Sequence, residues 1–298
     1  MSSRPAAALA SIGAAAIGVA LAVAQPRAAK LRSFSRGDVV VSFQDGSVQW
    51  HRADGSLYTV LKGTVPGNAE GMRFDASGNL YVSHWCVDGN CALGNTIEKF
   101  DVHGRSLGSV GSGYDCNPHA IDFDAAGHAY VGQADCTGDI LKFTLGQPPT
   151  SYTVAQENRG SFWIDLAPDD CTIFYTSWGP DILRYNACTQ TQLPRFNVVG
   201  LPGGETHGLA VLADGGVLVS SGAVVSRLNV AGIVVQTYSV SFEPEYWAGL
   251  DLVGDGTFWA VNYYTSNVHR FNLTTGARTE SFSTGAPVYT AVDVKVSP

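Results

Sequence analysis

Three residues that can bind a metal or move a proton stand at equivalent places in three similar segments. Glu70 lies in NAEGM, His119 in NPHAI and His207 in ETHGL, and each comes just before an alternating run typical of a β-strand. Two histidines and a carboxylate around an open position form a ligand set used in metal-assisted hydrolysis. We therefore expect these three residues to bind one divalent ion, calcium or zinc. Glu205 is expected to orient His207 or to act as a base beside it.

These segments belong to a repeat that runs through most of the chain. Stretches similar to GMRFDASGNLYV begin at residues 71, 120, 163, 208, 249 and 291, roughly 45 residues apart. Each holds a short alternating strand, a turn rich in Asp and Gly, and a second strand, and most continue into a third and a fourth. Four strands in a unit of this length predict a β-propeller blade, so we expect an all-β fold.

The two ends of the chain predict how the ring of blades closes. GDVVVSF, GSVQWHRADG and SLYTVL near the start match second, third and fourth strands, whereas AVDVKVSP at the end matches a first strand. Pairing of the C-terminal strand with the N-terminal strands completes a sixth blade and removes an open end. We expect one six-bladed β-propeller domain over residues 37–298, preceded by a leader segment over residues 25–36.

Propeller geometry brings the chemically active residues to one mouth of the central channel, which we call the top mouth. The residues just before the six first strands are Glu70, His119, Phe162, His207, Ala248 and Thr290. Nearby side chains predict the walls of a substrate site: His84, Trp85, Phe162, Trp163, Trp178, Trp247 and Tyr263. Two alternatives stay open, because a wet channel mouth is often polar and exposed aromatic residues also dock proteins or sugars.

A second ring lies two residues into the first strands. It contains Asp122, Asp165, Asp251 and Asp293, with Arg73 and Ala210 at the two other places. Buried carboxylates need partners. We expect these to be backbone amides of the next blade or channel water, with a cation in the channel as the alternative.

Six cysteines lie in the repeat region, and their places in the blades predict how they pair. Cysteines in loops on the same face of the propeller can meet, so the expected disulfides are Cys86–Cys91, Cys116–Cys136 and Cys171–Cys188. Such short links stiffen single blades and loops. Disulfides of this kind are typical of an exported protein.

Composition limits the possible partners. The 298 residues carry a formal charge of −8, and no basic stripe is present, which argues against nucleic acid and anionic membrane surfaces. Arg4, an Ala-rich apolar stretch and Ala22-Val23-Ala24 predict a signal peptide over residues 1–24. We expect a secreted or periplasmic monomer that leaves the membrane after cleavage.

The units resemble NHL-type propellers and the related regucalcin/gluconolactonase superfamily over about residues 37–298. The resemblance rests on AEGMRFDASGNLYVSHW and PHAIDFDAAGHAYVGQAD. It implies six blades with the site at the top mouth. Glu70 matches a metal-binding Glu of gluconolactonases, in which Asn and Asp usually complete the site, whereas His119 and His207 depart from that pattern. NPHAI looks like the zinc-binding pattern of peptidyl-hydroxyglycine lyases, and virginiamycin B lyase is similar in repeat style.

These observations predict a secreted, divalent-metal-dependent hydrolase of a lactone or small ester. Water activated by a metal on Glu70, His119 and His207 would attack the carbonyl carbon. A non-catalytic extracellular propeller that binds protein or carbohydrate is the alternative, and a metal-dependent lyase is the third possibility.

Overall fold

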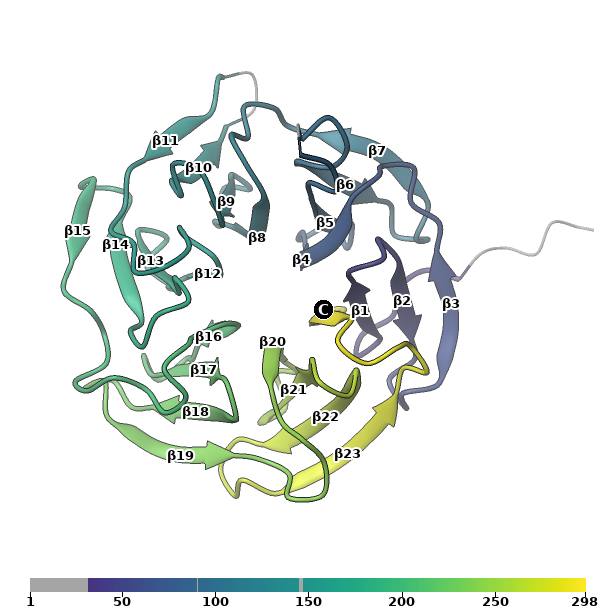
Figure 1. The fold of residues 1–298 in the computed structure, drawn as a ribbon, viewed down its shortest axis with the longest axis vertical. Coiled ribbons are helices and arrows are strands. Elements are labelled where there is room, and N and C mark those ends of the chain that lie inside the picture. Colours follow the sequence, from purple (N-terminus) through teal and green to yellow (C-terminus); the bar gives the residue numbers. More distant parts are fainter. Residues whose placement is uncertain (1–31, 90, 145–146) are drawn as a thin grey trace, which may run out of the picture. The chain divides into compact units, whose positions relative to one another are not determined.

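The computed structural model describes residues 32–89, 91–144 and 147–298, which form six antiparallel sheets of four strands arranged in a ring (Figure 1). These sheets are the blades of a six-bladed β-propeller, and they confirm the fold predicted from the repeats. Within this described part of the chain there is no helix, and so none that could span a membrane. The predicted signal peptide and residues 25–31 of the predicted leader lie outside the described residues.

Each blade runs from an inner strand at the channel to an outer strand at the rim (Figure 1). We name the blades A to F and give the strands of each from the channel outward: blade A has β24 (Ala291–Val296), β1 (Val39–Phe43), β2 (Val48–His51) and β3 (Leu57–Leu61), and blade B has β4 (Asn68–Phe74), β5 (Leu80–Trp85), β6 (Thr96–Phe100) and β7 (Ser106–Val110). Blade C has β8 (Pro118–Phe123), β9 (Ala129–Gln133), β10 (Ile140–Phe143) and β11 (Thr150–Tyr152), and blade D has β12 (Ile164–Leu166), β13 (Thr172–Tyr175), β14 (Leu183–Asn186) and β15 (Thr191–Leu193). Blade E has β16 (Leu209–Val211), β17 (Val217–Ser221), β18 (Val224–Leu228) and β19 (Val234–Tyr238), and blade F has β20 (Trp247–Leu252), β21 (Thr257–Asn262), β22 (Asn267–Asn272) and β23 (Arg278–Ser283).

Blade A closes the ring as the sequence predicts. The C-terminal strand β24 pairs antiparallel with β1, with Val39 opposite Val296 and Val41 opposite Val294. The last strand therefore fills the inner place that the N-terminal strands leave open. Residues 32–36 also pack on this blade, because the Phe34 ring lies 4.2 Å from the ring of Trp50 and Arg32 pairs with Asp38 at 2.8 Å.

The Asp-rich turns between first and second strands are stabilised by their own side chains. In blade B the Asp75 carboxylate accepts bonds from the backbone N–H groups of Ser77 and Asn79, both at 2.9 Å. Gly78 has a φ of +79°, a conformation that costs glycine little. The DASGN sequence thus specifies a tight turn and fixes the register of β4 against β5.

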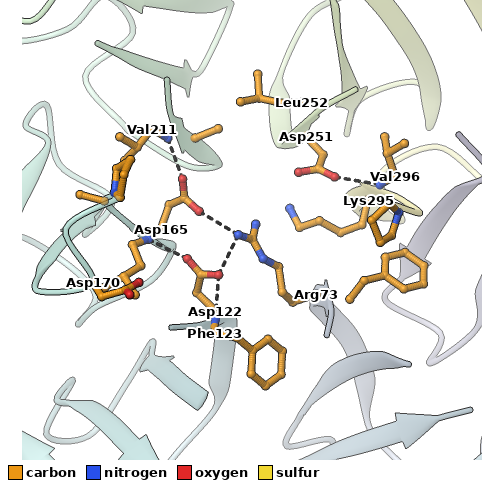
Figure 2. Close-up of a pocket in the computed structure, with 16 residues that line it drawn as sticks. Arg73, Asp122, Phe123, Asp165, Asp170, Val211, Asp251, Leu252, Lys295 and Val296 are labelled. Atoms are coloured by element: carbon orange, nitrogen blue, oxygen red, sulfur yellow. Dashed lines mark hydrogen bonds and ion pairs between the residues drawn. The ribbon is translucent and has the colours of Figure 1, made fainter. Parts of the chain in front are cut away.

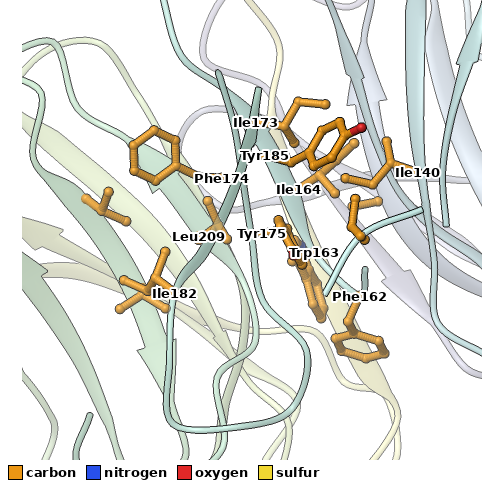
Figure 3. Packing of buried hydrophobic residues seen from close by; sticks show 14 of the residues in the cluster. Ile140, Phe162, Trp163, Ile164, Ile173, Phe174, Tyr175, Ile182, Tyr185 and Leu209 are labelled. Carbon is orange, nitrogen blue, oxygen red and sulfur yellow. The ribbon is translucent and has the colours of Figure 1, made fainter. Parts of the chain in front are cut away.

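Apolar side chains from blades C, D and E pack together between the sheets (Figure 3). Phe162, Trp163 and Ile164 come from the entry to β12, and Tyr175 comes from the end of β13. Burial of each large side chain contributes roughly 1.5–3 kcal/mol. This cluster fixes the inner part of blade D, and Phe162 and Trp163 connect it to the top mouth.

The ring of aspartates joins neighbouring blades, and Figure 2 shows Asp122, Asp165 and Asp251 of this ring. Each of the four carboxylates accepts a hydrogen bond from a backbone N–H of the next blade, which confirms the expected amide partners. The bonds are Asp122 to Leu166 N at 2.7 Å, Asp165 to Val211 N at 2.6 Å, Asp251 to Val296 N at 2.8 Å and Asp293 to Met72 N at 2.9 Å. Arg73 replaces this bond between blades B and C, since its guanidinium pairs with Asp122 at 2.7 Å.

Three disulfides form as predicted, between Cys86 and Cys91, Cys116 and Cys136, and Cys171 and Cys188. Their Cα atoms lie 4.8, 5.6 and 5.2 Å apart, respectively. Each link closes a short segment within one blade or its loops. Disulfides are typical of an extracellular or other oxidising compartment.

Candidate functional site

Three inner strands are bulged at the residue that faces the top mouth. The pairing register of β4, β8 and β20 shifts in a segment that includes Glu70, His119 and Ala248, respectively. A β-bulge bends its strand and re-aims a side chain. The blades also approach closely here, because a Cβ atom on Gly71 would lie 2.3 Å from the His119 carbonyl oxygen. Only glycine allows this contact between blades B and C.

Hydroxyl groups on second strands, or just after them, hold the backbone of the mouth residues. Each hydroxyl donates to the carbonyl oxygen of the mouth residue in the next blade. The bonds run from Ser42 to Glu70 at 2.5 Å, from Ser83 to His119 at 2.6 Å, from Thr176 to His207 at 2.9 Å and from Ser220 to Ala248. These four residues were not predicted, although a Ser or Thr recurs near the end of the second strand in VVVSF, LYVSH, FYTSW and VLVSS.

A cavity of about 390 Å³ lies at the top mouth. Its volume falls in the range of small-molecule sites. Seven of the predicted site residues line it: Glu70, Trp85, Phe162, Trp163, Trp178, His207 and Tyr263. Gln44, Arg159, Tyr246 and Tyr264 complete the polar and aromatic part of the wall.

Two residues predicted to contact substrate do not line this cavity. His84 follows the alternation of β5 and lies on the opposite face from Trp85, where its Nε2 atom is 3.3 Å from the Glu98 carboxylate. Trp247 likewise lies on the opposite face of β20 from Ala248, which lines the cavity. Its buried ring packs in the core of blades E and F, and its Nε1–H donates to Glu245 at 2.9 Å. Both side chains stabilise their blades.

His119 is enclosed by aromatic rings. Its imidazole stacks on Phe162 with ring centroids 4.0 Å apart and meets Trp163 edge-on at 4.2 Å. The side chain is completely buried, and neither ring nitrogen has a hydrogen-bond partner among the described residues. Burial, assisted by the nearby Arg159 charge, lowers the pKa of His119 well below its ordinary value. His119 is therefore a neutral ring at physiological pH.

The predicted metal site does not fit this arrangement. Among the residues that the structure describes, no group of three or more His, Cys, Asp and Glu side chains could hold a metal ion. Glu70 and His207 line the cavity, whereas His119 is not among its lining residues and packs against Phe162 and Trp163. The three side chains therefore do not form one ligand set for calcium or zinc.

Glu70 and His207 line the cavity, where burial favours the uncharged form of each side chain. Burial raises the pKa of the Glu70 carboxyl well above its ordinary value, although the positive charge of Arg159 opposes this shift. Burial lowers the pKa of His207 to about 4. Burial therefore favours the protonated carboxyl of Glu70, which can donate a proton, and it keeps His207 as a neutral imidazole near neutral pH, which can accept one.

Arg159, which no sequence pattern pointed to, forms part of the wall. Its guanidinium lies between the rings of Trp85 and Trp178, 4.8 and 4.7 Å from their centroids. It also pairs through two nitrogens with the Asp135 carboxylate. Asp135 pairs with the cation, and the two rings pack on either side of it.

Glu205 reaches His207 through a tyrosine. Its exposed carboxylate accepts a hydrogen bond from the Tyr246 hydroxyl at 2.8 Å, and the Tyr246 ring packs against His207 with centroids 5.0 Å apart. No hydrogen bond joins Glu205 to His207 among the described residues, so its role beside His207 stays a prediction. The pair of Glu205 and Tyr246 bridges two loops that are 41 residues apart in sequence.

Unpaired polar atoms are concentrated at the top mouth. The described residues contain eleven buried side-chain nitrogen or oxygen atoms without a hydrogen-bond partner. Six of them belong to this region: Glu70 Oε1, Trp85 Nε1, His119 Nδ1 and Nε2, Trp178 Nε1 and His207 Nε2. Buried polar groups are rarely left unpaired in a native protein, so such a concentration indicates a place where a ligand or water binds.

The opposite mouth of the channel contains a paired ionic network (Figure 2). Arg73 also contacts Asp165, at 3.4 Å, and Lys295 donates to Asp293 at 3.1 Å. Burial and the neighbouring Asp122 charge raise the pKa of Asp165 to about 8. None of these side chains is among the buried unpaired groups of the described residues.

Comparison with known proteins places the chain by fold alone. No family model and no curated protein matches the sequence. A chain of a nidogen/laminin complex is similar in structure, with a TM-score of 0.71 and 12% identity over 88% of this chain and 98% of that chain. A WD40 propeller domain of Doa1 is similar with a TM-score of 0.62 and 15% identity, covering 86% of this chain and 82% of that one.

A lyase also shares the architecture. A streptogramin B lyase superposes with a TM-score of 0.58 and 15% identity, over 86% of this chain and 76% of the lyase. At such identities the similarity concerns the propeller, which hosts both binding proteins and enzymes. The function therefore depends on the residues of the top mouth.

Proposed function

We propose that this protein binds a small, neutral, hydroxyl-rich ligand, a carbohydrate unit, in the cavity at the top mouth. The observation that supports this best is the group of unpaired polar atoms around the cavity. Hydroxyl groups both donate and accept hydrogen bonds, so a sugar can satisfy the carboxyl of Glu70, the imidazole of His207 and the indole N–H of Trp178 together. The flat faces of the aromatic walls suit the apolar face of a sugar ring.

The charges of the cavity favour a neutral ligand. Arg159 is already paired with Asp135, His207 is uncharged near neutral pH, and burial favours the uncharged form of Glu70. The chain as a whole carries a formal charge of −8, which repels anions. Without a free cation in the wall, an acidic sugar would leave its charge without a partner in the cavity.

Trp178 offers a sharp test because its backbone is strained. Its φ is +54°, a conformation that bulky residues rarely adopt. Such strain persists only where the surrounding structure enforces it, and it is concentrated at ligand-binding sites. Trp178→Gly removes the ring and relieves the backbone. A binding role predicts an affinity loss of roughly tenfold or more, and relief of the backbone strain should offset part of the packing that is lost with the ring.

The experiment is titration calorimetry of the purified protein with glucose, galactose, mannose and N-acetylglucosamine. Gln190→Gly is the matched control, since Gln190 has the same φ of +54° but lies in the turn between β14 and β15, away from the cavity. It should bind like the wild type. Lack of heat with all four sugars at millimolar concentration would overturn the proposal, as would equal affinity in Trp178→Gly and wild type.

A second function, cleavage of a lactone or small ester without a metal, is favoured by the opposite pKa shifts of Glu70 and His207. Groups whose pKa values are driven apart in one site can act as an acid and a base. Neutral His207 would take a proton from water as its oxygen attacks the carbonyl carbon. Glu70 would give its proton to the leaving alkoxide oxygen, and proton exchange with solvent would restore both groups.

This second function is tested with a panel of sugar lactones and acetyl esters in the presence of EDTA. Turnover that is retained with EDTA and lost in both Glu70→Gln and His207→Gln would establish it. If the same sugars bind but no lactone or ester is cleaved, the cavity is a binding site only.

A further inference from the structure

Four tyrosines form a continuous aromatic surface at one side of the cavity, and we call Tyr246, Tyr263, Tyr264 and Tyr289 the tyrosine shelf. Tyr246 stacks on Tyr264 with centroids 5.1 Å apart and an interplanar angle of 26°. Tyr289 meets Tyr264 edge-on at 5.4 Å and Tyr263 at 5.9 Å. The shelf combines the loop before β20, the loop after β21 and the loop before β24.

The shelf begins inside the cavity and ends in solvent. Tyr246, Tyr263 and Tyr264 line the cavity, and Tyr246 packs on His207. Exposure then increases outward, with 37% of Tyr264 and 52% of Tyr289 accessible. A ligand seated against His207 therefore has an aromatic path leading out of its site.

Tyr289 is held in position at a cost to its backbone. Its φ is +63°, in the left-handed region. Among the described residues, Trp178 and Tyr289 are the two aromatic residues with this conformation. The Tyr289 N–H donates to the Tyr263 carbonyl at 2.9 Å, which fixes the ring over the shelf. Strain at an exposed bulky residue is typical of ligand-binding positions, because core packing does not require it there.

The loop that carries Tyr289 is braced by side chains as well. Ser266 Oγ donates to the Pro287 carbonyl at 2.7 Å, and Thr290 Oγ1 donates to the same oxygen at 2.6 Å. Thr284 Oγ1 donates to the Ser266 carbonyl at 2.7 Å. A preorganised exposed ring loses little conformational entropy when a ligand covers it.

We propose that the tyrosine shelf extends the cavity into a binding groove for a neutral carbohydrate chain, whose end unit occupies the cavity and whose next units stack on Tyr264 and Tyr289. This inference rests on the proposed function. Tyrosine supplies both a flat face and a hydroxyl group, which matches the alternating apolar and polar surface of a sugar chain. The Glu205 carboxylate beside Tyr246 favours a neutral chain over an acidic one.

The test compares sugars of increasing length. Glucose, mannose and N-acetylglucosamine, and their linear oligomers of two to five units, are titrated into the purified protein. For the sugar that binds, the affinity should rise about tenfold or more from one unit to three and then level off. Tyr289→Ala should lower the affinity for the trimer at least about fivefold more than the affinity for the monomer.

Two further variants separate binding from folding. Tyr289→Gly accepts the φ of +63°, so it should lose the same trimer affinity without a fall in melting temperature. Phe242→Ala removes an exposed aromatic ring from the loop before β20, outside the shelf, and should leave trimer affinity unchanged.

The outcomes distinguish the two proposals. Equal affinity for monomer and trimer, or equal trimer loss in Phe242→Ala and Tyr289→Ala, would overturn the groove while the cavity site stands. Failure of every monomer and oligomer to bind would overturn the proposed function, and the groove with it.

Discussion

The two mouths of the central channel are built from the same strands but treat polar side chains in opposite ways. At the lower mouth Arg73, Lys295 and the ring of aspartates bond to each other or to backbone amides of the next blade. At the top mouth Glu70, His119 and His207 are buried with unpaired atoms among aromatic rings. The first arrangement stabilises the ring of blades, and the second leaves bonding capacity for another molecule.

This difference shows why position in a propeller is a weak guide to function. Both mouths present charged residue types at equivalent places in the repeats, and both enclose cavities of similar size, about 450 Å³ below and 390 Å³ above. The two mouths differ in whether their polar side chains are paired. Four predictions test this comparison.

The largest effect is expected from breaking the lower network. Arg73→Ala leaves the buried Asp122 carboxylate without its cation, and we expect a loss of about 3 kcal/mol in the free energy of unfolding, at the low end for a buried pair because the arginine side chain is partly exposed. Urea unfolding measures it. Arg105→Ala, which breaks an exposed pair with Asp101, should cost less than about 1 kcal/mol. Equal losses in the two variants would contradict a structural role for the lower network.

Acid should weaken the top mouth through His207. The pKa is about 4 in the folded protein against 6.5 ordinarily, so the unfolded chain takes up the proton first as pH falls. The stability gained by burying His207 as a neutral group is complete above pH 6.5 and is lost as pH falls toward 4. At pH 5 the loss amounts to about 2 kcal/mol. His207→Gln should lose this part of the pH dependence in urea unfolding from pH 7 to 5. An unchanged slope would show that His207 is not buried as a neutral group.

The lower mouth should respond to pH in the opposite direction. The pKa of Asp165 is raised to about 8 from 3.8, so the folded protein keeps a proton that the unfolded chain has lost. This contribution is complete below pH 3.8 and disappears as pH rises through 8, and about 2.7 kcal/mol of it is lost between pH 6 and 9. Asp165→Asn mimics the protonated form and should flatten this loss. If the stability of Asp165→Asn falls as steeply between pH 6 and 9 as that of the wild type, the raised pKa of Asp165 would be contradicted.

The smallest effect is expected at His119. Its ring is buried without hydrogen bonds between Phe162 and Trp163, so His119→Phe should raise stability by about 1 kcal/mol at pH 7 through removal of unpaired polar atoms. Thermal unfolding with sugar titration of the same variant measures it. A loss of stability together with a loss of sugar binding would show that His119 takes part in a site after all.

Much of the fold could be predicted because local patterns repeat. Asp-Gly turns, strand alternation and the matching chain ends predict six blades and their closure, and face-by-face placement of cysteines predicts all three disulfides. The aspartate bonds between blades also follow from strand position. For the site, the repeats place Glu70 and His207 at the mouth, and both line the cavity.

Other features of the site depend on contacts that no local pattern encodes. The sequence predicted that His119 would share a ligand set with Glu70 and His207, but packing from blade D encloses its ring. Arg159 lies in an ordinary loop, and its role depends on two tryptophans from other blades. The strained backbones of Trp178 and Tyr289 also arise only when neighbouring loops hold them.

The sequence by itself therefore determined the number of blades, the closure of the ring and the residue types at each mouth, because these follow from period and alternation along the chain. Only the tertiary structure decided which polar groups find partners. Pairing depends on distances of a few ångströms between blades, and these distances are set by bulges, by close glycine contacts and by aromatic packing across the ring.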